Sequence, residues 1–278
     1  MGICCCCRKK ETNNVISLYK ANKECNNLIN ELYNQTWRKR DVQEEYKQFI
    51  RGVQTKTELR KNYNLSIQMS AELAKICNFF REVRGDGNCF YTAFGFQYLR
   101  MILLKDKPNQ FAEFTKKYAN IQMKIFSDNF NTENEKIQAN LRTEFFKMIS
   151  QLRMIKDKQK REESFIKQFQ CYEDQQEMDC CLYGLSTIFF RNLANLVVDE
   201  NDLATLLYDR ENLLIWETEC NNNEVVISAL AKSLKIKILL VFFQNAGFEL
   251  KKYEEQHEDQ VILLIKPGHY NIGLYLEN

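Results

Sequence analysis

The sequence predicts an α+β fold, with a helical majority around a short C-terminal β-sheet. Apolar residues recur at helical spacing over most of the chain before residue 235. The long helical segments after the first third of the chain lie at 109–127, 134–154, 157–170 and 176–197. Strand-like runs appear only near the end, at 236–243, 261–265 and 270–276.

Composition narrows the functional classes. The chain has 278 residues, of which 45% are hydrophobic, enough for a substantial core. Its net charge of +2 disfavours a nucleic-acid binder. No apolar run reaches the length of a membrane span, and the N-terminus lacks the pattern of a secretory signal. We therefore expect a cytoplasmic protein whose eleven cysteines are free thiols.

The segments before residue 105 are predicted to be helical. Apolar spacing indicates helices over 15–37, 42–53 and 65–80. The residues from 89 to 104 are apolar on nearly every side, which is typical of a buried central helix. A turn-prone stretch, RGDGN at 84–88, precedes it and offers Asp86 and Asn88 as capping residues.

The rarest residues gather at two places. The chain has two histidines, two prolines and nine glycines. Five of these eleven glycines and prolines lie close to Cys89 or to His269, namely Gly85, Gly87, Pro267, Gly268 and Gly273. Glycine and proline set special backbone conformations, so both positions are candidates for a site.

The chemistry of a thiol and an imidazole fits that placement. Cys89 at a helix N-terminus would be stabilised as a thiolate, and nearby N–H groups could bind an oxyanion. His269 could serve as its base, and Asn271 lies on the same face of the predicted strand, where its amide could orient the imidazole. The alternative is an inert core thiol and a surface histidine, which cysteine statistics alone favour. The other histidine, His257, lies in a highly charged stretch and is expected to be an exposed loop residue.

Two motifs carry a family resemblance. RGDGNCFYTAF (84–94) resembles the DGNCFYRA nucleophile motif of the ovarian-tumour (OTU) cysteine proteases. PGHYNIGLY (267–275) is similar to the PGHYDILY-type histidine motif of their otubain branch. Weaker similarity covers 178–192 and 223–242, so the resemblance extends over roughly residues 40–278.

This resemblance implies an OTU fold and isopeptidase chemistry on ubiquitin or polyubiquitin. Cys89 would attack the carbonyl at the ubiquitin C-terminus and form a thioester, and His269 would move the proton. Asn271 would orient His269, and Asp86 would shape the nucleophile loop. The oxyanion would be bound by N–H groups of the loop Asp86, Gly87, Asn88 and Cys89. No metal and no organic cofactor is implied.

Several residues depart from the family pattern. Thr92 replaces an arginine that braces the loop, and Asn271 replaces the more frequent aspartate. Asn223-Glu224 stands in place of an Asp-His pair, and Gly273 interrupts the last strand, which suggests a β-bulge. The nucleophile and the base are both retained, which favours an enzyme over the alternative, a non-catalytic module that binds ubiquitin or a ubiquitin-conjugating enzyme.

The N-terminal residues MGICCCCRKK suggest lipidation. Gly2 fits N-myristoylation, although Cys6 occupies the usual Ser or Thr position. Palmitoylation is expected on the cysteines that follow, Cys4, Cys5, Cys6 and Cys7. Two acyl signals give stable anchoring, so we expect a tether to the cytosolic face of a membrane. A metal site at Cys4 and Cys7 and an untethered tail are the alternatives.

The chain is therefore divided into three parts. Residues 1–14 form the lipidated tail, residues 15–40 a helical extension, and residues 41–278 the OTU catalytic domain. In otubains such an extension can contact ubiquitin or a ubiquitin-conjugating enzyme. The apolar stripe of residues 15–37 favours ordinary packing on the domain.

Overall fold

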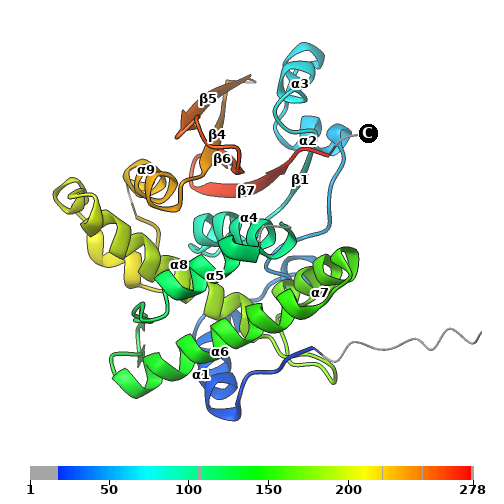
Figure 1. Ribbon diagram of the computed structural model, residues 1–278. Coiled ribbons are helices and arrows are strands. Elements are labelled where there is room, and N and C mark those ends of the chain that lie inside the picture. Colours follow the sequence, from blue (N-terminus) through cyan, green and yellow to red (C-terminus); the bar gives the residue numbers. More distant parts are fainter. Residues whose placement is uncertain (1–17, 106–107, 221, 246, 277–278) are drawn as a thin grey trace, which may run out of the picture.

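The computed structural model describes residues 18–105, 108–220, 222–245 and 247–276 (Figure 1). Gly2 and the cysteines from Cys4 to Cys7 lie outside these residues. The α-helices are α1 (Lys23–Gln35), α2 (Lys56–Asn62), α3 (Ile67–Leu73), α4 (Cys89–Leu104), α5 (Pro108–Lys117), α6 (Glu135–Met154), α7 (Lys158–Gln170), α8 (Cys181–Glu200) and α9 (Asn223–Leu234). The strands are β1 (Phe79–Arg81), β2 (Phe126–Ser127), β3 (Phe130–Asn131), β4 (Lys237–Gln244), β5 (Gly247–Tyr253), β6 (Gln260–Lys266) and β7 (His269–Leu274). The 3-10 helices are η1 (Trp37–Lys39), η2 (Glu44–Tyr46), η3 (Ala204–Leu206) and η4 (Arg210–Leu214). The predicted α+β class is confirmed.

The main sheet has five strands in the order β1-β7-β6-β4-β5. Only the β4–β6 pair is parallel; the other neighbours are antiparallel. Alternate residues of β4 belong to two different hydrophobic clusters. Ile238 and Leu240 pack in the cluster on the face of α4. Leu239 and Val241 pack in the cluster on the face of α2 and α3. The sheet is thus covered on both faces, and α4 lies directly against β7 (Figure 1).

Two helices form the centre of the main core. All but two residues of α4 are buried, as the all-round apolar pattern predicts. The helix α8 is long and apolar enough to cross a membrane, but 89% of its most apolar window is buried inside the fold. Because its surroundings are protein on nearly every side, α8 is a core helix. The described cysteines are free, buried thiols.

The helix α1 packs on the same core. Its buried residues Ile29, Leu32 and Tyr33 belong to the main hydrophobic cluster. Tyr33 donates a hydrogen bond to the carbonyl of Cys180, just before α8 begins. The packing role favoured by the apolar stripe is therefore confirmed for α1.

Four local predictions are wrong. The helix expected over 109–127 ends at Lys117, and Phe126–Ser127 form the strand β2. Residues 42–53 contain only the short η2 and then run alongside β1, where Ile50 bridges Val83 and Gln54 bridges Phe80. The expected helix over 65–80 ends at Leu73 and gives way to β1. Gly273 makes no bulge. It lies in regular register opposite Phe80 and Ile262, and an added Cβ would come within 2.6 Å of the Ile262 side chain.

Candidate active site

Cys89 is the first residue of α4, and the loop before it sets its position. The backbone of Gly87 has φ +74, a left-handed conformation that favours glycine. Asn88 occupies the N-cap position, but its side chain makes no capping hydrogen bond. Instead the N–H of Asn88 donates to Asp86 Oδ1 at 2.9 Å. The capping role expected for Asn88 is wrong, and its N–H is already engaged rather than available to an oxyanion.

The imidazole of His269 lies at the start of β7, after a turn in which Gly268 has φ +75. Its Nε2 lies 3.1 Å from Asn271 Oδ1. Asn271 is fixed in turn, because Oδ1 accepts from the Val83 N–H at 2.9 Å and Nδ2 donates to the Tyr63 hydroxyl at 2.9 Å. With Nε2–H directed at the amide oxygen, a neutral imidazole keeps its lone pair on Nδ1. That atom faces the nucleophile loop, 3.7 Å from where a Cβ on Gly85 would lie.

Truncating Asn271 is expected to slow catalysis without disturbing the nucleophile itself. Asn271→Ala removes the acceptor that orients the imidazole, and a misplacement of about 1 Å costs on the order of 10²-fold in kcat. Asn271→Asp retains an acceptor for Nε2–H and can accept from the rotatable Tyr63 hydroxyl, so its kcat should stay within about tenfold of wild type. Steady-state hydrolysis of a C-terminal ubiquitin amide, the substrate class that the sequence resemblance implies, measures both. Equal loss in the two variants would contradict the orienting role.

The thiol of Cys89 is only 1% exposed and donates to Glu219 Oε1 at 3.2 Å. Burial raises the pKa of Cys89 well above its ordinary value, and the negative charge of Glu219 raises it further. A backbone hydrogen bond with Tyr270, next to His269, acts in the opposite direction. The expectation of a helix-stabilised thiolate is therefore wrong for this structure. Desolvation and the facing carboxylate are the two largest causes of the raised pKa of Cys89.

Removing the Glu219 charge is expected to activate the thiol. In Glu219→Gln the pKa of Cys89 falls, and one pKa unit corresponds to about a tenfold larger thiolate fraction. We expect alkylation of Cys89 by iodoacetamide at pH 8 to become about tenfold faster, measured by intact-mass spectrometry. Glu224→Gln, at a largely exposed glutamate on α9, is the control. An unchanged alkylation rate in Glu219→Gln would show that the carboxylate does not restrain the thiol.

Asp86 is buried at the centre of the loop. Its Oδ2 accepts from the Tyr183 hydroxyl at 3.1 Å, while Oδ1 accepts from the loop N–H of Asn88. Burial raises the pKa of Asp86, and the nearby Arg84 opposes that rise. These contacts suit a residue that shapes the loop, since both carboxylate oxygens are engaged with the fold.

An arginine from α8 braces the same loop. Arg191 is fully buried and donates to Asn88 Oδ1 at 2.7 Å, to the Gly87 carbonyl at 3.1 Å and to the Thr218 carbonyl at 2.9 Å. Thr92, where the motif usually has arginine, donates to the Asn88 carbonyl at 3.0 Å. Sequence reasoning missed Arg191 as a site residue, although a charge inside an apolar helix was a visible sign. Glu219 carried no such sign, because its loop has no periodic pattern.

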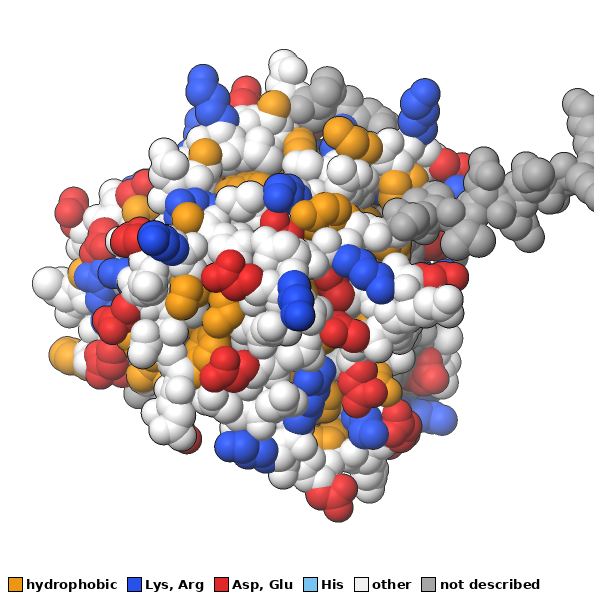
Figure 2. All heavy atoms as spheres, turned by 90° about the horizontal axis from the view of Figure 1, so that it is seen from below, with side chains coloured by type: hydrophobic (Ala, Val, Ile, Leu, Met, Phe, Trp, Pro, Cys, Tyr) orange, Lys and Arg blue, Asp and Glu red, His pale blue; other side chains and the backbone are white. Residues whose placement is uncertain are grey.

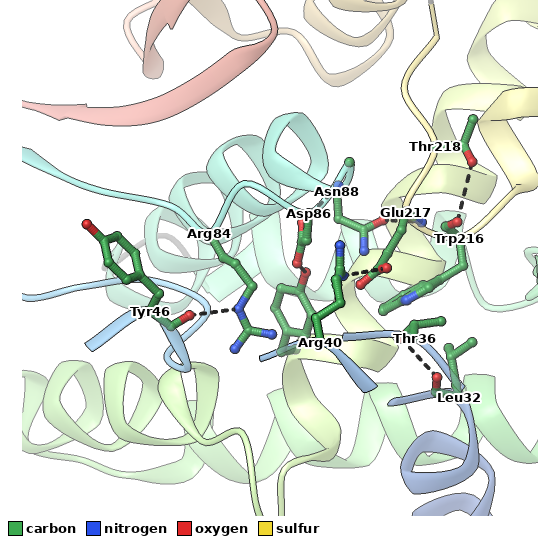
Figure 3. Close-up of polar contacts among 12 residues, drawn as sticks. Leu32, Thr36, Arg40, Tyr46, Arg84, Asp86, Asn88, Trp216, Glu217 and Thr218 are labelled. Atoms are coloured by element: carbon green, nitrogen blue, oxygen red, sulfur yellow. Dashed lines mark hydrogen bonds and ion pairs between the residues drawn. The ribbon is translucent and has the colours of Figure 1, made fainter. Parts of the chain in front are cut away.

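The loop also contacts the segment that carries Glu219. Figure 3 shows Asp86, Asn88 and Glu217 close together, with Arg40 reaching toward them from the N-terminal part of the chain. Glu217 donates its backbone N–H to Asn88 Oδ1 at 3.2 Å, and its carboxylate pairs with Arg40 at 2.6 Å.

A cavity of about 290 Å³ opens beside the imidazole. His269, Asn271 and Gly85 line one part of it, and Tyr46 and Lys266 line another. Cys89 is not among the residues that line this cavity. His257 lies in the turn between β5 and β6, at the opposite end of β6 from His269. In the described part of the chain, no group of three or more His, Cys, Asp or Glu residues could hold a metal ion.

Comparisons with known proteins identify a family and relatives of this chain. The family model described as "Peptidase C65 Otubain" matches residues 30–275. Ubiquitin thioesterase OTUB2 of Homo sapiens is 24% identical over 205 residues, covering 72% of this chain and 83% of the relative. OTUB2 of Mus musculus is 26% identical over 207 residues, with the same coverage. A solved structure of h/ceOTUB1 with ubiquitin aldehyde and UBCH5B~Ub has TM-score 0.60 at 16% identity, covering 90% of this chain and 95% of that one. A second, with UBC13~Ub, also has TM-score 0.60 at 16% identity, covering 91% and 96%.

Proposed function

Because the chain belongs to the otubain family of peptidases, we propose that it hydrolyses isopeptide bonds at the C-terminus of ubiquitin with Cys89 as nucleophile. The observation that supports this most is the oriented imidazole. His269 is held by Asn271 so that Nδ1 faces the loop that carries Cys89. A thiol at a helix N-terminus, a base and an amide that orients the base are the parts that acyl transfer requires.

The reaction proceeds in two halves. Nδ1 of His269 takes the thiol proton, and Sγ of Cys89 attacks the carbonyl carbon of the last ubiquitin residue. Main-chain N–H groups in the first turn of α4, which have no partner within the helix, stabilise the oxyanion. Collapse of the tetrahedral intermediate gives a thioester and a lysine amine, which leaves with the proton from His269. Water, deprotonated by His269, then hydrolyses the thioester and frees the thiol and the ubiquitin carboxylate.

The Glu219 contact must open before this sequence begins. In the structure the thiol proton is directed at Glu219 Oε1. Seating the ubiquitin tail next to Cys89 would displace that carboxylate and bring Sγ within reach of His269. A catalytic pair that tightens only when substrate binds is common among enzymes.

A second candidate is a module that binds ubiquitin or a ubiquitin-conjugating enzyme without turnover. The raised pKa of Cys89 and its contact with Glu219 favour it. The solved h/ceOTUB1 structures hold ubiquitin aldehyde with UBCH5B~Ub or UBC13~Ub. We extend these two partner classes, ubiquitin and a conjugating enzyme, to this chain as part of the proposal.

A ubiquitin probe with a thiol-reactive C-terminus separates the two candidates. We expect the wild-type chain to gain the mass of one ubiquitin, with the adduct on Cys89 after proteolysis. Chain blocked beforehand at Cys89 by iodoacetamide is the control and should give no adduct. Ubiquitin binding without an adduct would favour the module, and neither binding nor adduct would overturn both.

Lipidation of Gly2 and of the run from Cys4 to Cys7, and the membrane tether that follows from it, stays a prediction. Nothing in the described residues depends on it.

A further inference from the structure

The loop before Cys89 packs against one short segment, residues 217–218. The carbonyl of Glu217 lies so close to Gly87 that an added Cβ would come within 2.0 Å of its oxygen. On the neighbouring side, Arg191 Nη2 contacts both the Gly87 carbonyl and the Thr218 carbonyl. With the Glu217 N–H donated to Asn88, the segment at 217–218 and the nucleophile loop have little freedom to move separately.

Glu217 is unusual in both its backbone and its side chain. Its φ of 58 lies in the left-handed region, where the Cβ of an L residue comes too close to the following carbonyl oxygen. Its side chain is 14% exposed; Oε2 meets Arg40 Nη2 at 2.6 Å, and Oε1 is buried with no hydrogen-bond partner among the described residues. A strained backbone and a half-satisfied buried carboxylate persist only where the surroundings fix them. The backbone of this segment is fixed by the contacts with the nucleophile loop, and Oε2 of the carboxylate is held by the ion pair with Arg40.

The charged groups around Glu217 come from three parts of the chain. Arg40 follows η1, Arg84 and Asp86 precede α4, and Tyr183 lies on α8. Arg84 makes no ion pair with Glu217 in the structure; its guanidinium lies 4.2 Å from the ring centres of both Trp37 and Phe49, and its Nη1 and Nη2 have no hydrogen-bond partner among the described residues. Burial, and then the charge of Asp86, raise the pKa of Glu217 to about 7, and Arg40 opposes that rise. Near neutral pH the ion pair is therefore close to its titration point.

We propose that Glu217 is a positioning residue for the nucleophile loop, and that its ion pair with Arg40 holds it in the working position (Figure 3). Arg40 and Glu217 are 177 residues apart in sequence, so the segment after α1 and the loop at Cys89 are joined through one contact. The proposal rests on the proposed function only in taking Cys89 as the nucleophile.

The pH dependence of activity distinguishes a positioning role of the ion pair between Arg40 and Glu217 from a purely structural role of Arg40. Arg40→Gln and Glu217→Gln each remove the ion pair. Above pH 7 the wild-type Glu217 is ionised and paired. At pH 8 we therefore expect each variant to have a kcat/KM on a C-terminal ubiquitin aminocoumarin amide about tenfold below that of wild type, as for the loss of one charged contact. Below pH 6 the wild-type carboxyl is protonated as well, so the ratio of wild type to each variant should approach one. Arg40→Lys keeps the charge and should restore most of the activity.

The control is Arg100→Gln, which removes the ion pair of Arg100 with Glu162 at 2.5 Å, away from the loop. Its activity should stay within about twofold of wild type across the pH range. A purely structural role for Arg40 predicts a loss that is equal at every pH and follows the melting temperature. That result would overturn the proposal.

Hydrogen–deuterium exchange supplies a readout that does not need catalysis. At pH 8, peptides covering 85–91 and 215–220 should exchange faster in Arg40→Gln than in wild type, and not in Arg100→Gln. If the wild-type chain failed to hydrolyse ubiquitin but this difference appeared, the proposed function would fail and the positioning contact would stand. If activity fell while exchange stayed unchanged, the positioning role would be wrong.

Discussion

Cys89→Ala is expected to abolish both adduct formation with the ubiquitin probe and hydrolysis of a C-terminal ubiquitin amide. The side chain removed is the only thiol at the N-terminus of α4, and it lies beside the backbone of Tyr270, next to the base. His269→Ala should lower kcat by about 10³-fold, because general base and acid catalysis contributes roughly 10²–10⁴. Initial rates and intact-mass labelling measure the two effects.

Buried thiols elsewhere provide the matched control. Cys77 lies in the cluster between the sheet and the helices α2 and α3, and burial raises its pKa to about 12. Cys77→Ala should therefore label and hydrolyse as wild type does. Full activity in Cys89→Ala, or loss of activity in His269→Ala that coincides with unfolding, would argue against the proposed pair.

Gly87→Ala is expected to disrupt the site and the stability together. A methyl group there would lie 2.0 Å from the Glu217 carbonyl oxygen, and the residue would also have to adopt φ +74. The backbone strain alone costs about 1–2 kcal/mol, and the clash with main chain forces the loop to move. A shift of about 1 Å in the nucleophile loop should cost on the order of 10²-fold in kcat. Urea unfolding and ubiquitin amide hydrolysis measure the two losses.

Substitutions at two other glycines distinguish the cost of backbone strain from the cost of a steric clash. Gly268 has φ +75 but nothing within 4 Å of an added Cβ, so Gly268→Ala should cost only the strain. Gly52 has neither a positive φ nor a close neighbour, and Gly52→Ala should leave the free energy of unfolding nearly unchanged. If Gly87→Ala lost no more stability than Gly268→Ala, the close approach to Glu217 would not be a constraint.

The parts of the site that follow local rules were predictable. The helix α4 has the predicted bounds, Cys89–Leu104, because a segment that is apolar on every side must be central in a chain of this size. The pairing of His269 with Asn271 follows from strand alternation, which places residues two apart on one face. Both inferences use neighbours in sequence.

The parts that failed depend on neighbours in space. Glu219 is 130 residues from Cys89, and only the folded chain shows that its carboxylate faces the thiol. The apolar spacing over 42–53 resembled a helix, but it does not mark a buried face: Phe49 and Ile50 are buried, whereas Tyr46 and Val53 are exposed. β5 was missed because its outward side chains are charged at the edge of the sheet, as edge strands often are.

The place of β7 in the sheet has a consequence for biosynthesis. This strand follows β6 in sequence, inserts between β1 and β6 in the sheet, and carries the base His269. A nascent chain that has exposed residues up to about 265 carries the nucleophile and most of its helical core, yet lacks the imidazole. Domains fold as their residues emerge from the ribosome. The peptidase would therefore acquire its base only after β7 has emerged, so ribosome-bound chains and fragments that end before β7 would lack the imidazole of His269.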